Sequence, residues 1–316
     1  MTQRVARSER LRVQTDTLPR LLPPDSLRGT TLNPEARLGP RLRGLATLLE
    51  EASDEIRRPP RIARTGRASD GRTKARDSTL EDNGMKIGII GAGLIGGTLA
   101  RRWVQLGHDV SIANSRGPET LKDVAKETGA KAVTVQEAAK ATDVIVVTIP
   151  QKAVPALPKG LFANTPKDAV IIDTGNYYPV RDGQIQALDN GQVESEWVAS
   201  LIGRPVIKVF NNIFFKSLGE NGRPQGTPGR IALPVAGDSP EAKAKVLKWV
   251  EELGFDAIDA GSLADSWRQQ PGTPVYTQDR DAAGVKAALA EAKRERLPEY
   301  RNAANQWLKD FLAKQG

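Results

Sequence analysis

Three glycines in the stretch GAGLIG have the spacing at which a protein backbone binds the pyrophosphate of a dinucleotide. Gly91, Gly93 and Gly96 follow the apolar run 86–90, and an amphipathic helical pattern starts directly after them. In this G-x-G-x-x-G pattern the first glycine allows a tight turn, the second lets the backbone approach a phosphate, and the third lets a helix pack closely on a strand. The start of the helix also offers free N–H groups to the anion. We therefore predict a dinucleotide-binding loop, with a glycine-rich turn that binds no ligand as the alternative.

The stretch IANSRGPET carries a hydroxyl and a cation where dinucleotide-binding chains usually carry an acid. Asn114 stands 18 residues after Gly96, and Ser115 and Arg116 follow it. A carboxylate at this place would bind the ribose hydroxyls of NAD and repel a 2′-phosphate, whereas a hydroxyl and a guanidinium would bind that phosphate. We therefore predict NADP, or NADPH, as the cofactor. The alternative is that Arg116 is an ordinary arginine in a solvated loop, since exposed arginines are common.

Small and polar residues at the ends of two later strand patterns complete the predicted cofactor site. Ligands of parallel α/β sheets bind beyond the carboxyl ends of the strands. The residues at these ends are 148–150 and 174–176. The full set predicted to bind the cofactor is Gly91, Ala92, Gly93, Leu94, Ile95, Gly96, Asn114, Ser115, Arg116, Thr148, Ile149, Pro150, Thr174, Gly175 and Asn176.

Apolar runs that alternate with helical patterns predict the elements that hold these residues. We expect strands at 86–90, 109–114, 131–135, 143–150, 169–175, 206–213 and 231–238. We expect helices from about 94 to Gly107, at 135–142 and 239–254, and two within 281–316 that are broken at Pro298. Apolar strands separated by helices indicate a doubly wound, mostly parallel sheet. The predicted fold class is α/β: a Rossmann domain at 85–212 and a small C-terminal α/β-helical domain at 213–316.

The composition limits which residues could serve as acids, nucleophiles or metal ligands. The chain has no cysteine and one histidine, His108, which excludes thiolate chemistry and a multi-histidine metal site. His108 lies between the first helix and the second strand, at the end of the sheet away from the predicted site. Lys152 could approach that site but also fits an exposed lysine, and Asp173 fits a turn residue better than a general base. We predict no metal site and assign no catalytic residue.

Hydride transfer between a nicotinamide and another conjugated ring needs little acid–base help, and the available residues suit this reaction. It requires two rings held close together in a dry pocket. Trp267 and Tyr276 could stack on such a ring, although packing in the core or an interface is the more common role of aromatic residues. Asn211 and Asn212 end a strand pattern and could bind the nicotinamide amide or satisfy the loop backbone.

The excess of positive charge is concentrated in the first part of the chain. The net charge is +8, and residues 1–84 contain 16 arginines, one lysine, 12 acidic residues and none of the 15 aromatic residues. Such a segment cannot bury enough apolar surface to fold alone. We predict that 1–84 is a disordered, dispensable extension, or translated upstream sequence, because Met85 stands directly before the first strand. A basic arm that binds nucleic acid or an anionic surface is the alternative. We expect neither nucleic acid nor a membrane as a partner.

From Met85 to the C-terminus, the sequence resembles the NADP oxidoreductases that depend on the deazaflavin coenzyme F420 and the wider group of dinucleotide-binding enzymes around them. The motifs that carry the resemblance are KIGIIGAGLIGGTLA, NSRGPETL, VVTIPQ, DTGNYYP, GRPVIKVFNN, AGD and GFDAIDAGSLADSWRQQPGTPVY. The first two occur in many Rossmann proteins, and the last, residues 254–276, is more specific. The resemblance implies NADP bound by the Rossmann domain, a small C-terminal domain that closes over the nicotinamide, and a homodimer.

These observations together predict a cytoplasmic, NADPH-dependent oxidoreductase with a small-molecule electron acceptor. The expected acceptor is a flavin, a deazaflavin or another small conjugated compound, which would act as co-substrate. One alternative is a non-catalytic NADP(H) sensor, because the chain shows no obvious catalytic dyad. Another is a different reductase subclass, such as a β-hydroxyacid or imine reductase. Such enzymes commonly add a long all-helical domain with a catalytic lysine, and the C-terminal region here is too small for that.

Overall fold

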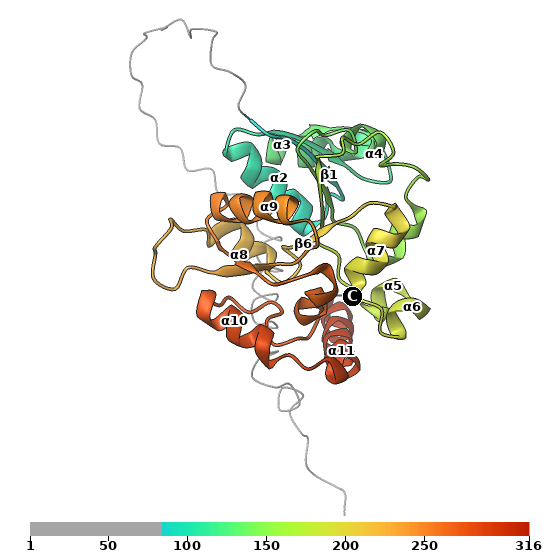
Figure 1. The fold of residues 1–316 in the computed structure, drawn as a ribbon. Coiled ribbons are helices and arrows are strands. Elements are labelled where there is room, and N and C mark those ends of the chain that lie inside the picture. The colour runs from blue at the N-terminus through green and yellow to red at the C-terminus, as the bar shows by residue number, and fades with distance from the viewer. Residues whose placement is uncertain (1–83, 316) are drawn as a thin grey trace, which may run out of the picture. The chain divides into compact units, whose positions relative to one another are not determined.

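The computed structural model describes residues 84–315, and its centre is a six-stranded parallel sheet (Figure 1). The predicted N-terminal extension therefore lies outside the described residues, apart from Gly84. The strands are β1 (Lys86–Ile90), β2 (Asp109–Ala113), β3 (Lys131–Ala132), β4 (Val144–Val147), β5 (Val170–Asp173) and β6 (Ile207–Lys208). They lie in the order β3-β2-β1-β4-β5-β6, with every neighbouring pair parallel. This order, which reverses direction between β1 and β4, is that of a dinucleotide-binding sheet, so the predicted Rossmann fold is confirmed.

Helices and short 3₁₀ turns connect the strands and form most of the C-terminal region. The helices are α2 (Leu94–Gln105), α3 (Lys122–Thr128), α4 (Val135–Ala138), α5 (Pro179–Asp182), α6 (Gln186–Asp189), α7 (Glu194–Ile202), α8 (Phe215–Glu220), α9 (Pro240–Glu252), α10 (Ala282–Glu291) and α11 (Leu297–Gln315). The 3₁₀ turns are η2 (Pro118–Leu121), η3 (Gln151–Ala156), η4 (Leu263–Gln269) and η5 (Arg294–Arg296). Within residues 84–315, none of these helices combines the length and apolar composition that crossing a bilayer requires.

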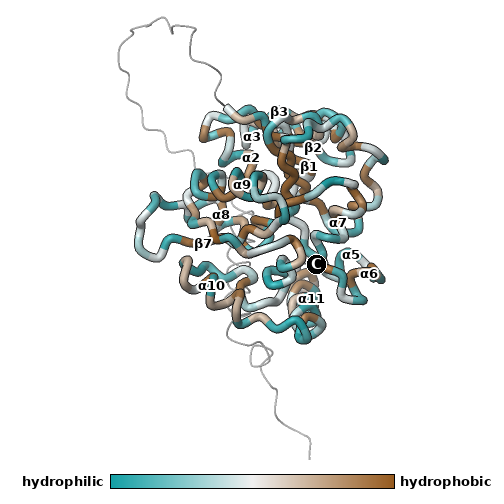
Figure 2. The backbone as a smooth tube through the Cα atoms, viewed as in Figure 1, coloured by the Kyte–Doolittle hydropathy of each residue, from teal (hydrophilic) through white to brown (hydrophobic). Residues whose placement is uncertain are grey.

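Helices cover both faces of the sheet, because successive strand residues point to opposite sides. On β1, Ile87 shares a core with Leu99 of α2, whereas Ile90 shares another with Ala138 of α4. In Figure 1, α2 and α9 lie on one side of β1, and α4 and α7 lie on the other. All four residues of β4 are buried, as expected for a strand covered on both faces. The most hydrophobic stretch of the tube accordingly runs through β1 and its neighbours (Figure 2).

Helix α9 begins and ends at the signals that the sequence provides. The Ser239 hydroxyl accepts a hydrogen bond from the backbone N–H of Ala242 at 3.2 Å, and Pro240 occupies the first turn. Gly254 lies just beyond the last turn with a φ of +91°, a left-handed conformation that glycine adopts most easily. The prediction for 239–254 is therefore confirmed by a helix at 240–252.

A second, two-stranded parallel sheet consists of β7 (Ala232–Val235) and β8 (Asp256–Asp259), which α9 connects. The backbones of Lys208 in β6 and Ala236 after β7 exchange two hydrogen bonds, of 2.8 and 3.0 Å, and so join the two sheets. Leu233 of β7 belongs to the same apolar core as Ile87 of β1. The core is therefore continuous across residue 212, and a domain boundary at that residue stays a prediction.

Several predicted strands are shorter in the structure, and each has a local cause. The strand predicted at 131–135 ends at Ala132, because Thr134 and Glu137 form a capping box that starts α4 at Val135. The strand predicted at 206–213 ends at Lys208, because Phe210 takes a φ of +62° that no strand allows.

The predicted break at Pro298 is wrong in position. The chain is extended at Ala292 and Lys293, between α10 and η5. Pro298 instead lies in the first turn of α11, where the missing N–H of proline costs no helical hydrogen bond.

Candidate functional site

A cavity of about 750 Å³ lies at the carboxyl ends of β1, β2 and β4, where the strand order reverses. This is the place where open α/β sheets bind their ligands. The predicted residues that line it are Gly91, Ala92, Gly93, Asn114, Ser115, Arg116, Thr148, Ile149 and Pro150. The predicted residues that do not line it are Leu94, Ile95 and Gly96, which lie in α2, and Thr174, Gly175 and Asn176, which follow β5. The structure thus brings together the residues from three of the four predicted segments.

The three motif glycines have different surroundings, which match the different functions of the pattern. Gly91 has a φ of +120°, and an added Cβ would lie 2.1 Å from the carbonyl oxygen of Thr148. An added Cβ on Gly96 would lie 2.0 Å from the carbonyl oxygen of Gly91. An added Cβ on Gly93 would have no neighbour within 4 Å. Gly91 and Gly96 are therefore required by the fold, whereas Gly93 leaves its backbone open to the cavity.

The loop after β2 is held by the side chain of Asn114. Its Oδ1 accepts a hydrogen bond from the backbone N–H of Arg116 at 2.9 Å, and its Nδ2 donates to Oγ1 of Thr120 at 2.9 Å. Ser115 and Arg116 are exposed. The Arg116 guanidinium makes no hydrogen bond or ion pair with residues 84–315, so its charge is available to an anion in the cavity. The bracing function of Asn114 was not predicted, although Asn is a frequent residue of such turns.

The loop after β5 starts from a buried pair of opposite charges that the sequence analysis missed. Lys208 Nζ donates to Asp173 Oδ2 at 3.0 Å and to the carbonyl oxygen of Gly175 at 2.5 Å. Asp173 also accepts hydrogen bonds from the Ser195 hydroxyl at 2.7 Å and from the backbone N–H of Gly175 at 2.7 Å. Both charged side chains are almost fully buried. A lysine inside the apolar run VIKVF was the sequence signal, since a buried lysine needs a partner.

Asn176 and Asn211 fasten this loop to the one after β6. The Asn176 amide donates to the backbone oxygen of Asn211 at 2.9 Å, and the Asn211 amide donates back to Asn176 Oδ1 at 3.1 Å. Asn211 also donates to the backbone oxygen of Gln269 at 2.7 Å and accepts a hydrogen bond from the Gln269 side chain at 3.1 Å. Asn211 therefore forms hydrogen bonds with groups of the neighbouring loops, which is one of the two functions that the sequence suggested for it.

Two further buried polar residues near this loop were not predicted. Gln151, which follows Pro150, is fully buried, and neither end of its carboxamide has a hydrogen-bond partner among residues 84–315. Glu194 begins α7 and is also buried. Burial raises the pKa of Glu194 to about 7, although Lys208 and Arg301 act in the opposite direction. The sequence QVESEW is typical of an exposed helix start, so the sequence gives no signal that Glu194 is buried.

The two aromatic residues singled out in the sequence pack inside the protein. Trp267 is 6% exposed and packs in a cluster with Val193 and Tyr300. The Tyr276 hydroxyl lies 2.5 Å from that of Tyr178, and both rings are buried. The packing interpretation of these aromatics is therefore the one that the structure supports.

His108 lies at the opposite edge of the sheet from the cavity. Its Nδ1 accepts a hydrogen bond from the backbone N–H of Met85 at 3.2 Å, and its Nε2 lies 3.1 Å from Glu252 Oε1. These contacts tie the start of β1 to the last turn of α9. His108 thus lies away from the candidate cavity, at the end of the sheet that the sequence predicted for it.

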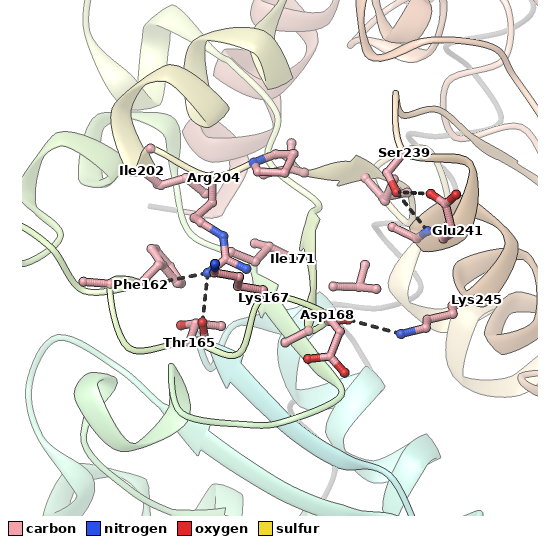
Figure 3. A pocket seen from close by; sticks show the side chains of 18 of the residues that line it. Phe162, Thr165, Lys167, Asp168, Ile171, Ile202, Arg204, Ser239, Glu241 and Lys245 are labelled. Carbon is pink, nitrogen blue, oxygen red and sulfur yellow. Dashed lines mark hydrogen bonds between the residues drawn. The ribbon is translucent and has the colours of Figure 1, made fainter.

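A second cavity of about 750 Å³ opens at the amino ends of β5 and β6 (Figure 3). The Arg204 guanidinium there donates to the backbone oxygens of Phe162, Thr165 and Pro166 at 3.0 to 3.2 Å. Lys245 donates to the backbone oxygen of Asp168 at 3.1 Å. These cations are engaged in holding the loops, and the cavity lies at the edge of the sheet away from the glycine motif. We therefore take the first cavity as the candidate site.

The strand order, the glycine loop and the cavity where the order reverses define a dinucleotide-binding protein of the Rossmann class. The chain belongs to the family of coenzyme F420-dependent NADP oxidoreductases, whose family profile matches residues 86–177. By family, the protein is an NADP-dependent oxidoreductase, and the predicted membership is confirmed.

Two proteins of known sequence are similar to parts of the chain. Protein YjhV of Escherichia coli (strain K12) is 46% identical over 103 residues, which are 31% of this chain and 68% of YjhV. Metalloreductase STEAP3 of Rattus norvegicus is 29% identical over 182 residues, which are 57% of this chain and 35% of STEAP3.

Two solved structures share the fold. Protein SMa0349 of Sinorhizobium meliloti has a TM-score of 0.53 and 29% identity, with 62% of this chain and 94% of that one covered. A protein of Arthrobacter sp. FB24, provisionally named an F420-dependent NADP-reductase, has a TM-score of 0.50 and 24% identity, with 58% and 87% covered. The second similarity supports the fold alone.

Proposed function

We propose that the protein transfers hydride between NADPH and a small conjugated acceptor of the flavin or deazaflavin type. The observation that carries this proposal is the cavity in which the open backbone of Gly93 and the unpaired guanidinium of Arg116 both face the same space. NADP has two anionic groups, a pyrophosphate and a 2′-phosphate. Backbone N–H groups at Gly93 would bind the first, and the Arg116 guanidinium would bind the second. The residues present therefore fit the cofactor that the family implies.

Each part of the predicted set has its own proposed task. The loop 91–96 binds the pyrophosphate through backbone N–H groups, and Ser115 and Arg116 bind the 2′-phosphate. The segments 148–150 and 174–176 line the nicotinamide half, since the second group of strands in such sheets takes the second mononucleotide. When bound, NADPH supplies the hydride. The protein's own residues orient the two rings and exclude water, because this transfer needs little proton chemistry.

The nature of the acceptor can be tested with a panel of compounds. We expect the protein to oxidise NADPH, followed by its absorbance, in the presence of a flavin or a deazaflavin. Tight binding of NADPH without oxidation by any acceptor would favour the sensor. Reduction of a ketone or imine in place of a flavin would favour the other reductase subclass. The resemblance also supports a homodimer, and the cytoplasmic location stays a prediction.

The motif glycines allow the fold and the cofactor site to be tested separately. Gly93→Ala should leave stability nearly unchanged, because the added methyl meets open space at a backbone geometry that alanine tolerates. It should weaken NADPH binding roughly tenfold or more, since the methyl occupies the backbone's approach to the pyrophosphate. Gly96→Ala should instead destabilise the protein by about 1–3 kcal/mol or more, through overpacking against Gly91. Thermal unfolding and NADPH titration measure the two effects, and equal stability losses in both variants would contradict the assignment.

His108→Gln tests whether the single histidine takes part in the reaction. We expect NADPH oxidation by the best acceptor at nearly the wild-type rate, because the ring contacts Met85 and Glu252 at the other edge of the sheet. Loss of a general acid or base would lower the rate roughly a hundredfold or more. A loss of that size in steady-state turnover, without a change in stability, would show that the histidine reaches the reacting groups.

A further inference from the structure

Glu194 belongs to a buried charged cluster at the end of β5 and β6. It is 1% exposed, and its Oε2 accepts a hydrogen bond from the backbone N–H of Tyr177 at 3.1 Å. Its Oε1 has no hydrogen-bond partner among residues 84–315. A buried carboxylate with a single hydrogen-bond donor is costly as an anion, so an added positive charge nearby would favour its ionised form.

The cluster directly adjoins the segments proposed to hold the nicotinamide. Lys208 binds the carbonyl oxygen of Gly175. An added Cβ on Gly175 would lie 2.7 Å from Nε2 of Gln151 and 2.9 Å from Oδ1 of Asp173. Gln151 in turn follows Pro150, which lines the cavity. Gln151 therefore links a residue of the cavity wall to the loop that Lys208 and Asp173 hold.

The charges around Glu194 leave its proton finely balanced. Lys208 and Asp173 carry opposite charges, and Arg301 forms an ion pair with Asp189 at 3.8 Å. The cluster is therefore neutral when Glu194 is protonated and carries a net negative charge when it is ionised. Burial raises the pKa of both tyrosines of the Tyr178–Tyr276 pair, so they stay neutral near pH 7. The charged and titratable groups that face Glu194 are Lys208 on β6, Asp173 on β5, Arg301 on α11, and Tyr178 and Tyr276.

We propose that Glu194 is a proton-holding group that senses the charge of the nicotinamide ring, an inference that rests on the proposed function. The ring is neutral in NADPH and positive in NADP⁺. With the neutral ring in place Glu194 keeps its proton. With the positive ring in place the O–H bond of Glu194 breaks, the proton goes to solvent, and the resulting carboxylate stabilises the cation. The hydride adds to the acceptor, which then takes one proton from solvent, so the proton that Glu194 releases balances the one that the acceptor gains.

The test is the ratio of NADP⁺ to NADPH affinity as a function of pH. Ionisation of Glu194 favours NADP⁺, so the affinity for NADP⁺ relative to NADPH should rise with pH through about 7. A charge pair across the cavity wall shifts such a pKa by about one unit, which gives a roughly tenfold rise in the ratio. Both nucleotides carry the same titrating 2′-phosphate, so its contribution cancels in the ratio.

Matched variants of one helix identify the group. Glu194→Gln should give a ratio that is independent of pH, whereas Glu196→Gln, two residues along α7 and partly exposed, should behave as wild type. A wild-type ratio that does not change with pH, or a change that persists in Glu194→Gln, would overturn the inference. Failure of the wild type to bind either nucleotide would instead refute the cofactor assignment, and the inference with it.

A second measurement needs no variant at position 194. When NADP⁺ displaces NADPH from the wild-type protein near pH 7 in weak buffer, a pH indicator should record the release of a fraction of a proton per site. Release should be absent well below the pKa of Glu194, where both complexes stay protonated. Displacement without proton release near pH 7 would contradict the proposal even if Glu194→Gln failed to fold.

Discussion

Replacement of Arg116 by alanine is expected to weaken NADPH binding roughly ten- to hundredfold and to leave NADH binding nearly unchanged, because one charge-assisted hydrogen bond is worth that much. The Arg116 guanidinium lies at the cavity and has no partner among residues 84–315, so it is free to bind a phosphate that only NADPH carries. Titration of the oxidised and reduced forms of both nucleotides measures the difference. The loss should shrink as salt increases, since the side chain is exposed and its charge is screened.

A matched control separates this local effect from a change in overall charge. Arg294→Ala removes an exposed arginine of η5 and should leave both affinities unchanged. Equal losses for NADPH and NADH in Arg116→Ala would mean that the residue only steadies the loop. A wild-type preference for NADH would refute the NADP assignment of this site.

Lys208→Met is expected to lower the free energy of unfolding by about 3–5 kcal/mol, because it leaves the buried Asp173 carboxylate without its counter-charge. Methionine is close to lysine in volume, so the cost should come from the charge rather than from a cavity. Denaturant unfolding followed by circular dichroism measures the change. Lys248→Met, at an exposed position of α9, is the control and should cost little.

The double variant Asp173→Asn with Lys208→Met distinguishes loss of the pair from loss of packing. It removes both charges and should recover part of the stability that Lys208→Met loses. Recovery of none would show that the stem of Lys208, and not its ammonium group, carries the effect.

The parts of the site that the sequence revealed are those built from neighbouring residues. The spacing of Gly91, Gly93 and Gly96 encodes a turn and the start of a helix within six residues, and Ser115 and Arg116 lie side by side in one loop. The Thr134–Glu137 capping box was equally local, and its three-residue spacing could have corrected the strand predicted at 131–135.

The missed parts arise from residues far apart in the chain. Asp173 and Lys208 are separated by 35 positions and meet only because β5 and β6 are neighbours in the sheet. Glu194 acquires its properties from burial beneath elements that the periodicity of its own helix does not reveal. The oddity of a lysine within an apolar run was visible in the sequence, but its partner required the order of the strands.

Lys208 connects two parts of the fold, one through its backbone and the other through its side chain. Its backbone closes the two hydrogen bonds to Ala236 that join the sheets, while its ammonium group holds Asp173 and Gly175. If β7 separates from β6, Lys208 loses these backbone hydrogen bonds, and its contact with the buried Asp173 is weakened as well. We therefore expect local opening of the C-terminal region to be coupled energetically to loss of the loop after β5, so that the two regions unfold together.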